Sequence, residues 1–518
     1  MIAPVTAREA LMPSSDARAL AGRSRRLPVR LGPRRLRVLA AGIVAAGLLA
    51  GAGAGALSPP ARAATVRGLG VGLTDDPLFL RSSPSQQAYW LGRARTLGSG
   101  WVRLGAIWAQ IAPGSRPAHF RAADPADRAY NWSLLDQAVR EAVAHGQTPV
   151  INVHGTPAWA EGADRPSWAG LGTWVPSAPA FGAFARALAR RYSGHFADPL
   201  HRGRKLPRVR YFQAWNEPNL LGYLSPQWVL DAHNHVVAYS PGLYRSLLNA
   251  FYAGVKRSVP GDIVIAAGTA PYGDAPGQGS GRIQPRTFLE GLFCLNGALR
   301  RTGCPGGAAH LDGLDHHVYS PPWYSSPSGN DISVPDLNRI WSVLAAARRL
   351  HTVAPNTPKS LWISEFGVNS NPSDAAALAL QAHYLELDLF EFWSEHVSNA
   401  FWFSLRDPGL AAGSFFATGG LITQAGTAKP AASAFRFPFV AVPAGHRRAT
   451  VWGRAPRGGT VVIERLAGKR WRRVTSLRTG SDHVFYGRIH LSGKPQVRAV
   501  IGGHASASWT PGVDGRLR

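Results

Sequence analysis

A chain of 518 residues with 45% hydrophobic residues, a formal net charge of +27 and two cysteines is long enough for two or three domains and can bury a large core. These values exclude a disordered chain, and two cysteines are too few for a disulfide-stapled mini-protein or a four-thiolate zinc site. The basic excess lies at the two ends, +8 over residues 1–63 and +12 over 441–518. The section between them carries only +7. A nucleic-acid enzyme would concentrate basic residues around its cleft, so we expect no nucleic-acid partner.

The first 63 residues have the pattern of an export signal. Residues 23–37 are strongly basic, 38–57 form one apolar run rich in Ala and Gly, and Ala61-Arg62-Ala63 matches a small-residue cleavage site. We therefore expect a secreted or cell-surface protein. The alternative is an uncleaved membrane anchor, since about 20 apolar residues can span a bilayer.

Residues 64–440 alternate short apolar runs with segments of helical pattern. The runs are typical of strands buried on both faces, and they lie at 67–73, 100–108, 148–154, 208–215, 262–268, 311–319, 360–366 and 399–405. The helical segments are 84–97, 132–146, 178–194, 241–258, 285–300, 334–353 and 373–396. Eight strands separated by helices predict an α/β fold, a (β/α)8 TIM barrel. The alternative, an open doubly wound sheet, lacks the helix-opening G-x-G-x-x-G turn.

Two glutamates stand where buried strands of the predicted barrel end. Glu217 follows the fourth apolar run and Glu365 lies at the end of the seventh. In such barrels the chemistry is carried at the carboxyl ends of the strands. Two desolvated carboxyl groups across a narrow hollow favour different protonation states, which is what glycoside hydrolysis requires.

The motifs around these glutamates resemble those of glycoside hydrolase clan A, the retaining (β/α)8 hydrolases. Trp-Asn-Glu-Pro at 215–218 is similar to the acid/base motif of that clan, and Trp-Ile-Ser-Glu-Phe-Gly at 362–367 is similar to its nucleophile strand. The resemblance covers about 66–435 and points to cellulase-like family 5 or to family 39. It implies Glu217 as acid/base, Glu365 as nucleophile and Asn216 on the sugar 2-hydroxyl. It further implies substrate-site roles for Arg103, His154, His317, Tyr319 and Trp402.

Other aromatic and histidine residues are also candidates for the site. Flat indoles cover the apolar faces of sugar rings, so we predict that Trp159 contacts substrate as Trp402 does. Asp315-His316-His317 and His233-x-His235 lack a HExxH frame and third-ligand spacing, so no metal is expected. No cofactor is expected either, because the hydrolysis described above requires none. No G-x-S-x-G motif is present, which disfavours a serine hydrolase. Cys294 and Cys304 are expected to form a local disulfide in an oxidising compartment.

After about residue 440 the helical pattern stops and short alternating strands follow. They predict a small β-sandwich over 441–518, similar to the Ig-like accessory domains of secreted hydrolases. Its Arg excess suggests a polyanionic cell-wall or membrane surface as partner. The sequence as a whole predicts a secreted retaining β-glycosidase that takes an oligo- or polysaccharide. The alternatives are a catalytically silent carbohydrate-binding protein and a transglycosylase that uses the same site.

Overall fold

The structure, a computed structural model, describes residues 66–275, 281–321, 328–409, 416–491 and 493–512. The predicted export signal lies outside the described residues. Within them no helix combines the length and the apolar character that crossing a membrane would require.

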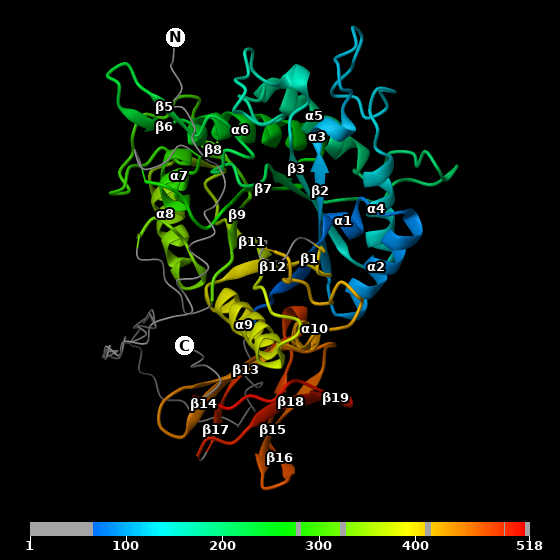
Figure 1. Cartoon of the computed structure of the whole chain (residues 1–518), viewed down its shortest axis with the longest axis vertical. Coiled ribbons are helices and arrows are strands. Elements are labelled where there is room, and N and C mark those ends of the chain that lie inside the picture. Colours follow the sequence, from blue (N-terminus) through cyan, green and yellow to red (C-terminus); the bar gives the residue numbers. More distant parts are fainter. Residues whose placement is uncertain (1–65, 276–280, 322–327, 410–415, 492, 513–518) are drawn as a thin grey trace, which may run out of the picture. The chain divides into compact units, whose positions relative to one another are not determined.

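Eight parallel strands close into a barrel, which confirms the predicted (β/α)8 fold (Figure 1). Each of the eight predicted apolar runs overlaps one of these strands, and the bounds differ by up to a few residues. Around the barrel the order is β1 (Gly70–Thr74), β2 (Trp101–Ile107), β3 (Thr148–His154), β4 (Tyr211–Ala214), β7 (Ile263–Thr269), β9 (Gly313–Val318), β11 (Ser360–Phe366) and β12 (Val397–Phe403).

Helices cover the outside of this ring because their apolar residues recur at helical spacing. In α5, for example, Phe181, Phe184, Ala185 and Leu188 are fully buried, and the Ser177 side chain caps the first turn. The helices are α1 (Asp76–Phe79), α2 (Pro84–Thr96), α3 (Trp108–Ile111), α4 (Ser133–Ala144), η1 (Ala158–Ala160), α5 (Ala178–Arg191), α6 (Ser240–Ser258), α7 (Pro285–Leu292), η2 (Val334–Asp336), α8 (Asn338–Arg349), α9 (Ala375–Ser394) and α10 (Pro430–Arg436).

The helix predicted over 285–300 is shorter than expected. It ends at Leu292, and Cys294 then adopts a left-handed conformation with φ of 53°. A turn follows, closed by a bridge between Leu295 and Arg301. This turn brings the chain back, and Cys294 forms the expected disulfide with Cys304.

Inward-facing residues fill the barrel in layers, as in other barrels of this type. The bottom layer is apolar and contains Val150, Ile265, Trp362 and Phe401. One step toward the carboxyl ends lie the polar side chains of Arg103, Asn152, Gln213, Asp315 and Ser364, all buried. The apolar layer excludes water from below, so these polar groups must satisfy one another.

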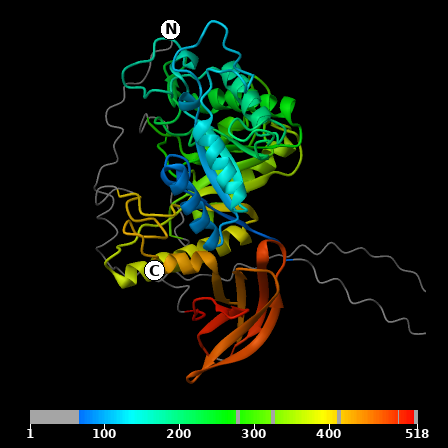
Figure 2. The same ribbon diagram turned by 90° about the vertical axis from the view of Figure 1, so that its right-hand side faces the viewer.

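Two antiparallel sheets follow the barrel, as the sequence predicts, and are coloured orange to red in Figure 2. One has the order β13-β14-β17 and the other β16-β15-β18-β19. Their strands are β13 (Phe439–Pro443), β14 (Arg448–Arg454), β15 (Thr460–Ala467), β16 (Arg470–Arg478), β17 (Val484–His490), β18 (Val497–Ile501) and β19 (His504–Ala505), with η3 (Ser481–His483) before β17. The first sheet begins at Phe439. Two short sheets, β5 (Trp228–Leu230) with β6 (Val236–Ala238) and β8 (Ala309–His310) with β10 (Val353–Ala354), complete the fold.

Helix α9 contacts these C-terminal sheets through aromatic side chains. The ring of Phe390 lies 5.9 Å from that of Trp452, the ring of Trp393 lies 5.0 Å from that of Tyr486, and His383 stacks on Trp509 at 4.1 Å. The backbone N–H of Phe439 also donates to Glu386 at 3.4 Å. The same helix therefore covers the barrel on one side and the sheets on the other.

Candidate active site

Glu217 belongs to a segment that neighbouring strands hold in an uncommon conformation. Both Trp215 and Glu217 have positive φ, 77° and 40°. The Trp215 backbone N–H donates to Val153 at 2.8 Å, and that of Glu217 donates to Gly268 at 2.9 Å. Left-handed non-glycine residues persist only where the surroundings enforce them, and they concentrate at functional sites. Here they direct the Glu217 side chain toward the mouth of the barrel.

Glu365 reaches the same place through an irregularity in β11. Trp362 pairs with Asp315 and Glu365 with His317, so three steps along β11 match two along β9. Such a bulge redirects side chains and is common beside active sites. As a result, Ser364 and Glu365, although adjacent, both reach the polar interior.

The two glutamates meet as the sequence predicts. A carboxylate oxygen of Glu217, one of Glu365 and a ring nitrogen of His317 all lie within 4.8 Å of one another. Both glutamate side chains are 13% exposed. A sugar placed at the mouth could therefore reach both.

Both oxygens of the Glu365 carboxylate accept a hydrogen bond. Arg103 donates from Nη1 to Oε1 at 2.7 Å, and the Tyr319 hydroxyl donates to Oε2 at 2.5 Å. Burial favours the neutral acid, but the charges of His317 and Arg103 and the Tyr319 hydrogen bond outweigh it, so the pKa of Glu365 lies below its usual range. This carboxylate is ionised and oriented, as a nucleophile must be.

Glu217 has the opposite tendency. Burial raises its pKa above the usual range, although a hydrogen bond from His317, 2.9 Å from Nδ1 to Oε1, partly opposes the rise. The negative charge of Glu365 acts in the same direction as burial. Two carboxyl groups whose pKa values are driven apart define an acid and a base.

Asn216 and His154 also lie at this site, as predicted. Asn216 accepts from Arg103 Nη2 at 2.5 Å through Oδ1, which orients its amide. His154 bonds Asn152 through Nδ1 at 3.0 Å. Burial, helped by the charge of Arg103, lowers its pKa to about 4, so the ring is neutral. It can exchange hydrogen bonds with a hydroxyl without adding charge.

The predicted contact between Trp402 and substrate is wrong. Side chains alternate along a strand, and Phe401 faces the barrel interior, so Trp402 points outward. Its indole is completely buried, and Nε1 donates to the carbonyl of Gly419 at 3.0 Å. Phe403, which is half-buried and next in the inward series, occupies the position expected for Trp402.

Trp159 is likewise placed in a different cluster. Its ring meets Trp108 and Phe120 edge-on, Arg116 lies over it at 5.5 Å, and Nε1 donates to Pro113 at 2.8 Å. These contacts join it to the loop after β2. They do not link it to the glutamates.

Sequence reasoning missed Tyr223 and Phe403. Tyr223 lies in the loop after Glu217, with its hydroxyl beside the Asn216 amide and its ring 5.8 Å from that of His154. Phe403 lines a hollow of about 90 Å³ with Tyr319, Asn369 and Phe416. The strand period could have favoured Phe403 over Trp402, whereas nothing in the sequence singles out Tyr223.

Glu217, His317 and Glu365 could be considered as metal ligands. Their geometry fits proton transfer better, because both oxygens of Glu365 already accept hydrogen bonds and the Arg103 cation lies beside them.

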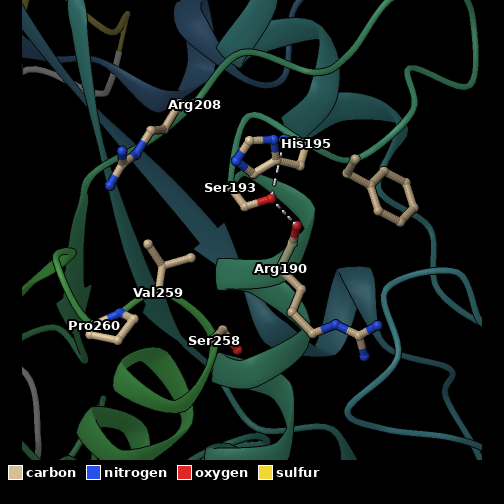
Figure 3. Close-up of a pocket in the computed structure, with 8 residues that line it drawn as sticks. Arg190, Ser193, His195, Arg208, Ser258, Val259 and Pro260 are labelled. Carbon is tan, nitrogen blue, oxygen red and sulfur yellow. Dashed lines mark hydrogen bonds between the residues drawn. The ribbon is translucent and has the colours of Figure 1, made fainter.

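A second hollow, about 440 Å³, lies between the ends of α5 and α6 and before β4 (Figure 3). Its labelled residues include Arg190, His195 and Arg208 and no carboxylate, so the glutamate pair remains the candidate active site.

No protein-family model and no curated protein sequence matches this chain. Among solved structures it is similar to a family 39 glycoside hydrolase from Bacteroides cellulosilyticus WH2, with 18% identity, a TM-score of 0.49 and coverage of 84% of this chain and 81% of that one. It is also similar to a monomeric β-xylosidase from Caulobacter crescentus CB15, with 16% identity, a TM-score of 0.48 and coverage of 83% and 98%. An exo-β-1,4-mannosidase from Opitutaceae bacterium strain TAV5 has 15% identity, a TM-score of 0.43 and coverage of 71% and 58%. These likenesses concern architecture, so the case for an activity rests on the side chains of the site.

Proposed function

We propose that this protein is a retaining glycoside hydrolase of the clan A type that acts on β-linked glycosides. One observation carries the proposal: carboxylate oxygens of Glu217 and Glu365 lie within 4.8 Å, with the pKa of the first raised and that of the second lowered. Retaining enzymes place their two carboxyl groups about 5–5.5 Å apart, whereas inverting enzymes need about 6.5–9.5 Å to admit a water. The short separation therefore supports retention.

The mechanism has two displacements. Glu365 attacks the anomeric carbon while Glu217 gives its proton to the departing oxygen, and a covalent glycosyl-enzyme forms. Glu217, now ionised, takes a proton from water, whose oxygen displaces Glu365 from the sugar. Asn216, oriented by Arg103, has an amide N–H₂ that can donate to a sugar hydroxyl, and such a bond strengthens in the transition state.

A screen of aryl β-glycosides and soluble glucan, xylan and mannan tests the activity, and NMR of the first-formed product shows whether the anomeric configuration is retained. Glu365→Gln should abolish turnover, and azide should partly restore bond cleavage to Glu365→Gly, with the configuration of the azide product inverted. Full activity in Glu365→Gln would refute the proposal. Absence of any turnover with binding intact would favour a silent carbohydrate-binding protein. Transfer products in place of free sugar would indicate a transglycosylase.

We further propose that the protein is exported and contacts a polyanionic cell-wall polymer. The disulfide between Cys294 and Cys304 supports an oxidising compartment. Residues 441–512 contain 13 Arg and Lys but only two acidic residues. On the edge strand β16, Arg472 lies directly opposite Arg465, and no acidic group of the described residues lies within 4.0 Å of either. Like charges in such cross-strand positions repel each other, which an anionic polymer would relieve.

Co-sedimentation of the full chain with polyphosphate-bearing wall fragments, at increasing NaCl, tests this contact. Arg465→Gln/Arg472→Gln should weaken binding, and Arg128→Gln/Arg202→Gln, which removes the same charge from the barrel surface, should not. Equal losses in both double variants would show that only net charge matters and would overturn the proposal.

A further inference from the structure

A third carboxylate, Asp315, lies beneath the glutamate pair and has no role in the mechanism above. It stands on β9 two residues before His317 and is fully buried. Burial of an unpaired carboxylate costs several kcal/mol, so its surroundings must stabilise it strongly.

The groups around Asp315 are donors. Gln213 Nε2 lies 2.6 Å from Oδ2, the Ser364 backbone N–H lies 2.7 Å from Oδ1, and the Ser364 hydroxyl donates to Oδ2. The Gln213 amide cannot be reversed, because its Oε1 accepts from Arg103 Nε at 2.8 Å and an arginine can only donate. A carboxyl group that receives three donors is ionised.

Ser364 transmits this charge to His317. Its hydroxyl has one proton, which goes to Asp315, so its oxygen must accept from His317 Nε2, 3.1 Å away. Nε2 therefore carries hydrogen. On the other side of the ring, Nδ1 faces Oε1 of Glu217 at 2.9 Å and Oε2 of Glu365 at 3.6 Å, which are acceptors for a second proton.

We propose that Asp315, acting through Ser364, is a positioning residue that holds His317 as an imidazolium ion between the two glutamates. This inference rests on the proposed function. It adds to that function a fixed positive charge at the centre of the site, which Asp315 and Ser364 in the polar layer beneath the glutamates maintain.

With His317 as a cation, the charges of the central groups balance throughout the reaction. Arg103 and His317 supply two cations, and Asp315 supplies one permanent anion. Before attack the second anion is Glu365, while Glu217 holds the proton. In the glycosyl-enzyme Glu365 is a neutral ester and Glu217 is the anion. The net charge of these five groups is thus zero in both states, so neither displacement changes the charge balance among them in a water-poor cavity.

The surroundings of His317 favour the cation. Burial alone would lower its pKa, but the charge of Glu365 and the hydrogen bonding and charge of Asp315 and Glu217 raise it to about 10. The adjacent His316 bonds Thr269 and the carbonyl of Ile332, and burial lowers its pKa to about 4, so it adds no competing charge.

Gly268 packs directly against this network: a Cβ there would lie 2.6 Å from Gln213 Nε2 and 2.8 Å from Asp315 Oδ2. The glycine thus permits the close packing of the network.

The test is Asp315→Asn in the full chain, observed by NMR of ¹⁵N-labelled histidine, with His317→Gln identifying the signal. In the wild type both ring nitrogens of His317 should remain protonated at pH 8. In Asp315→Asn one should be unprotonated at that pH, and kcat should fall about 10–100-fold, as is typical when a partner that orients a reacting group is lost. KM should change little, because Asp315 lies below the sugar position.

Asp312→Asn is the matched control, since Asp312 precedes the same strand, accepts from Val264 and pairs with Lys256 outside the polar layer. It should leave the His317 signal and kcat unchanged. If Asp315→Asn does not fold, Ser364→Ala decides, because it removes the hydroxyl bridge and leaves only the Asp315 carboxylate, 3.6 Å from His317 Nε2: the His317 signal should shift and kcat should fall. A doubly protonated His317 with unchanged kcat in either folded variant would overturn the inference. Inactive wild-type protein with the same NMR result would instead contradict the proposed function alone.

Discussion

Arg103 on β2 and Glu365 on β11 form an ion pair of 2.7 Å inside the barrel, where the arginine side chain is 3% and the glutamate side chain 13% exposed. Solvent screens such a pair weakly, so the guanidinium, together with His317, favours the ionised form of the proposed nucleophile. Arg103 also donates to Gln213 and Asn216, so one side chain connects the proposed nucleophile, the proposed sugar contact and the buried polar layer.

Replacing Arg103 should move the acidic limb of the pH profile. That limb of kcat/KM reports ionisation of Glu365 in the free enzyme. Arg103 lowers the pKa of Glu365, so Arg103→Gln should raise it and move the limb to higher pH. Arg103→Lys, which keeps the charge but loses the planar fork, should move it less. Activity measured from pH 3 to 9 checks the order, and an unmoved limb in Arg103→Gln would contradict the assignment of Glu365.

Replacing Glu217 should affect poor leaving groups most. Glu217→Gln cannot donate a proton, so glycosides with alkyl leaving groups should react about 10²–10⁴-fold more slowly. Aryl glycosides whose leaving group is a weak base need little protonation, so the rate of their first displacement should fall much less. The basic limb, which reports loss of the Glu217 proton, should also disappear. Uniform losses across leaving groups would argue against a general-acid role.

Trp402 and Phe403 should have separable effects. Trp402→Ala removes a fully buried side chain and should lower the free energy of unfolding by about 3–5 kcal/mol. Phe403→Ala removes a half-buried ring that lines the hollow beside Tyr319, so it should raise KM with a smaller loss of stability. Thermal unfolding and steady-state kinetics of both variants separate the two roles. The reverse pattern would restore Trp402 as the substrate contact.

Removing the disulfide should reduce stability without affecting catalysis. Cys294→Ser/Cys304→Ser opens a loop of ten residues, which should cost about 2–3 kcal/mol. The loop follows α7 on the outside of the barrel, so kcat and KM should remain those of the wild type. Thermal unfolding of the wild-type protein should be measured with and without reductant and compared with that of the double variant. An equal midpoint of the wild type in both conditions would contradict a structural role for the disulfide.

The barrel and the glutamate pair were predictable because both depend on local pattern. Apolar runs of seven to nine residues define parallel strands, and the end of a strand defines where a side chain emerges, so the proximity of Glu217 and Glu365 could be predicted from the sequence. The C-terminal strands were predictable for the same reason, since Val461 and Ile463, for example, alternate with more exposed neighbours.

The inward or outward direction of individual side chains was less predictable. Trp402 and Phe403 are adjacent aromatic residues, and alternation along β12 shows which one faces the interior only when the inward direction of a neighbour such as Phe401 is known. The bulge in β11 that brings Ser364 and Glu365 to the same side leaves no trace in the composition of the strand. Tyr223 reaches the site through loop geometry, to which periodicity does not apply.

The aromatic contacts of α9 also determine how the molecule can be divided. Phe390 and Trp393 face Trp452 and Tyr486, so a barrel produced without residues 439–512 would present bare rings to water. Exposed apolar patches of that kind promote self-association. A shortened version would therefore be expected to precipitate during purification even with its catalytic groups intact, and preparations for assay should retain the entire carboxyl-terminal region.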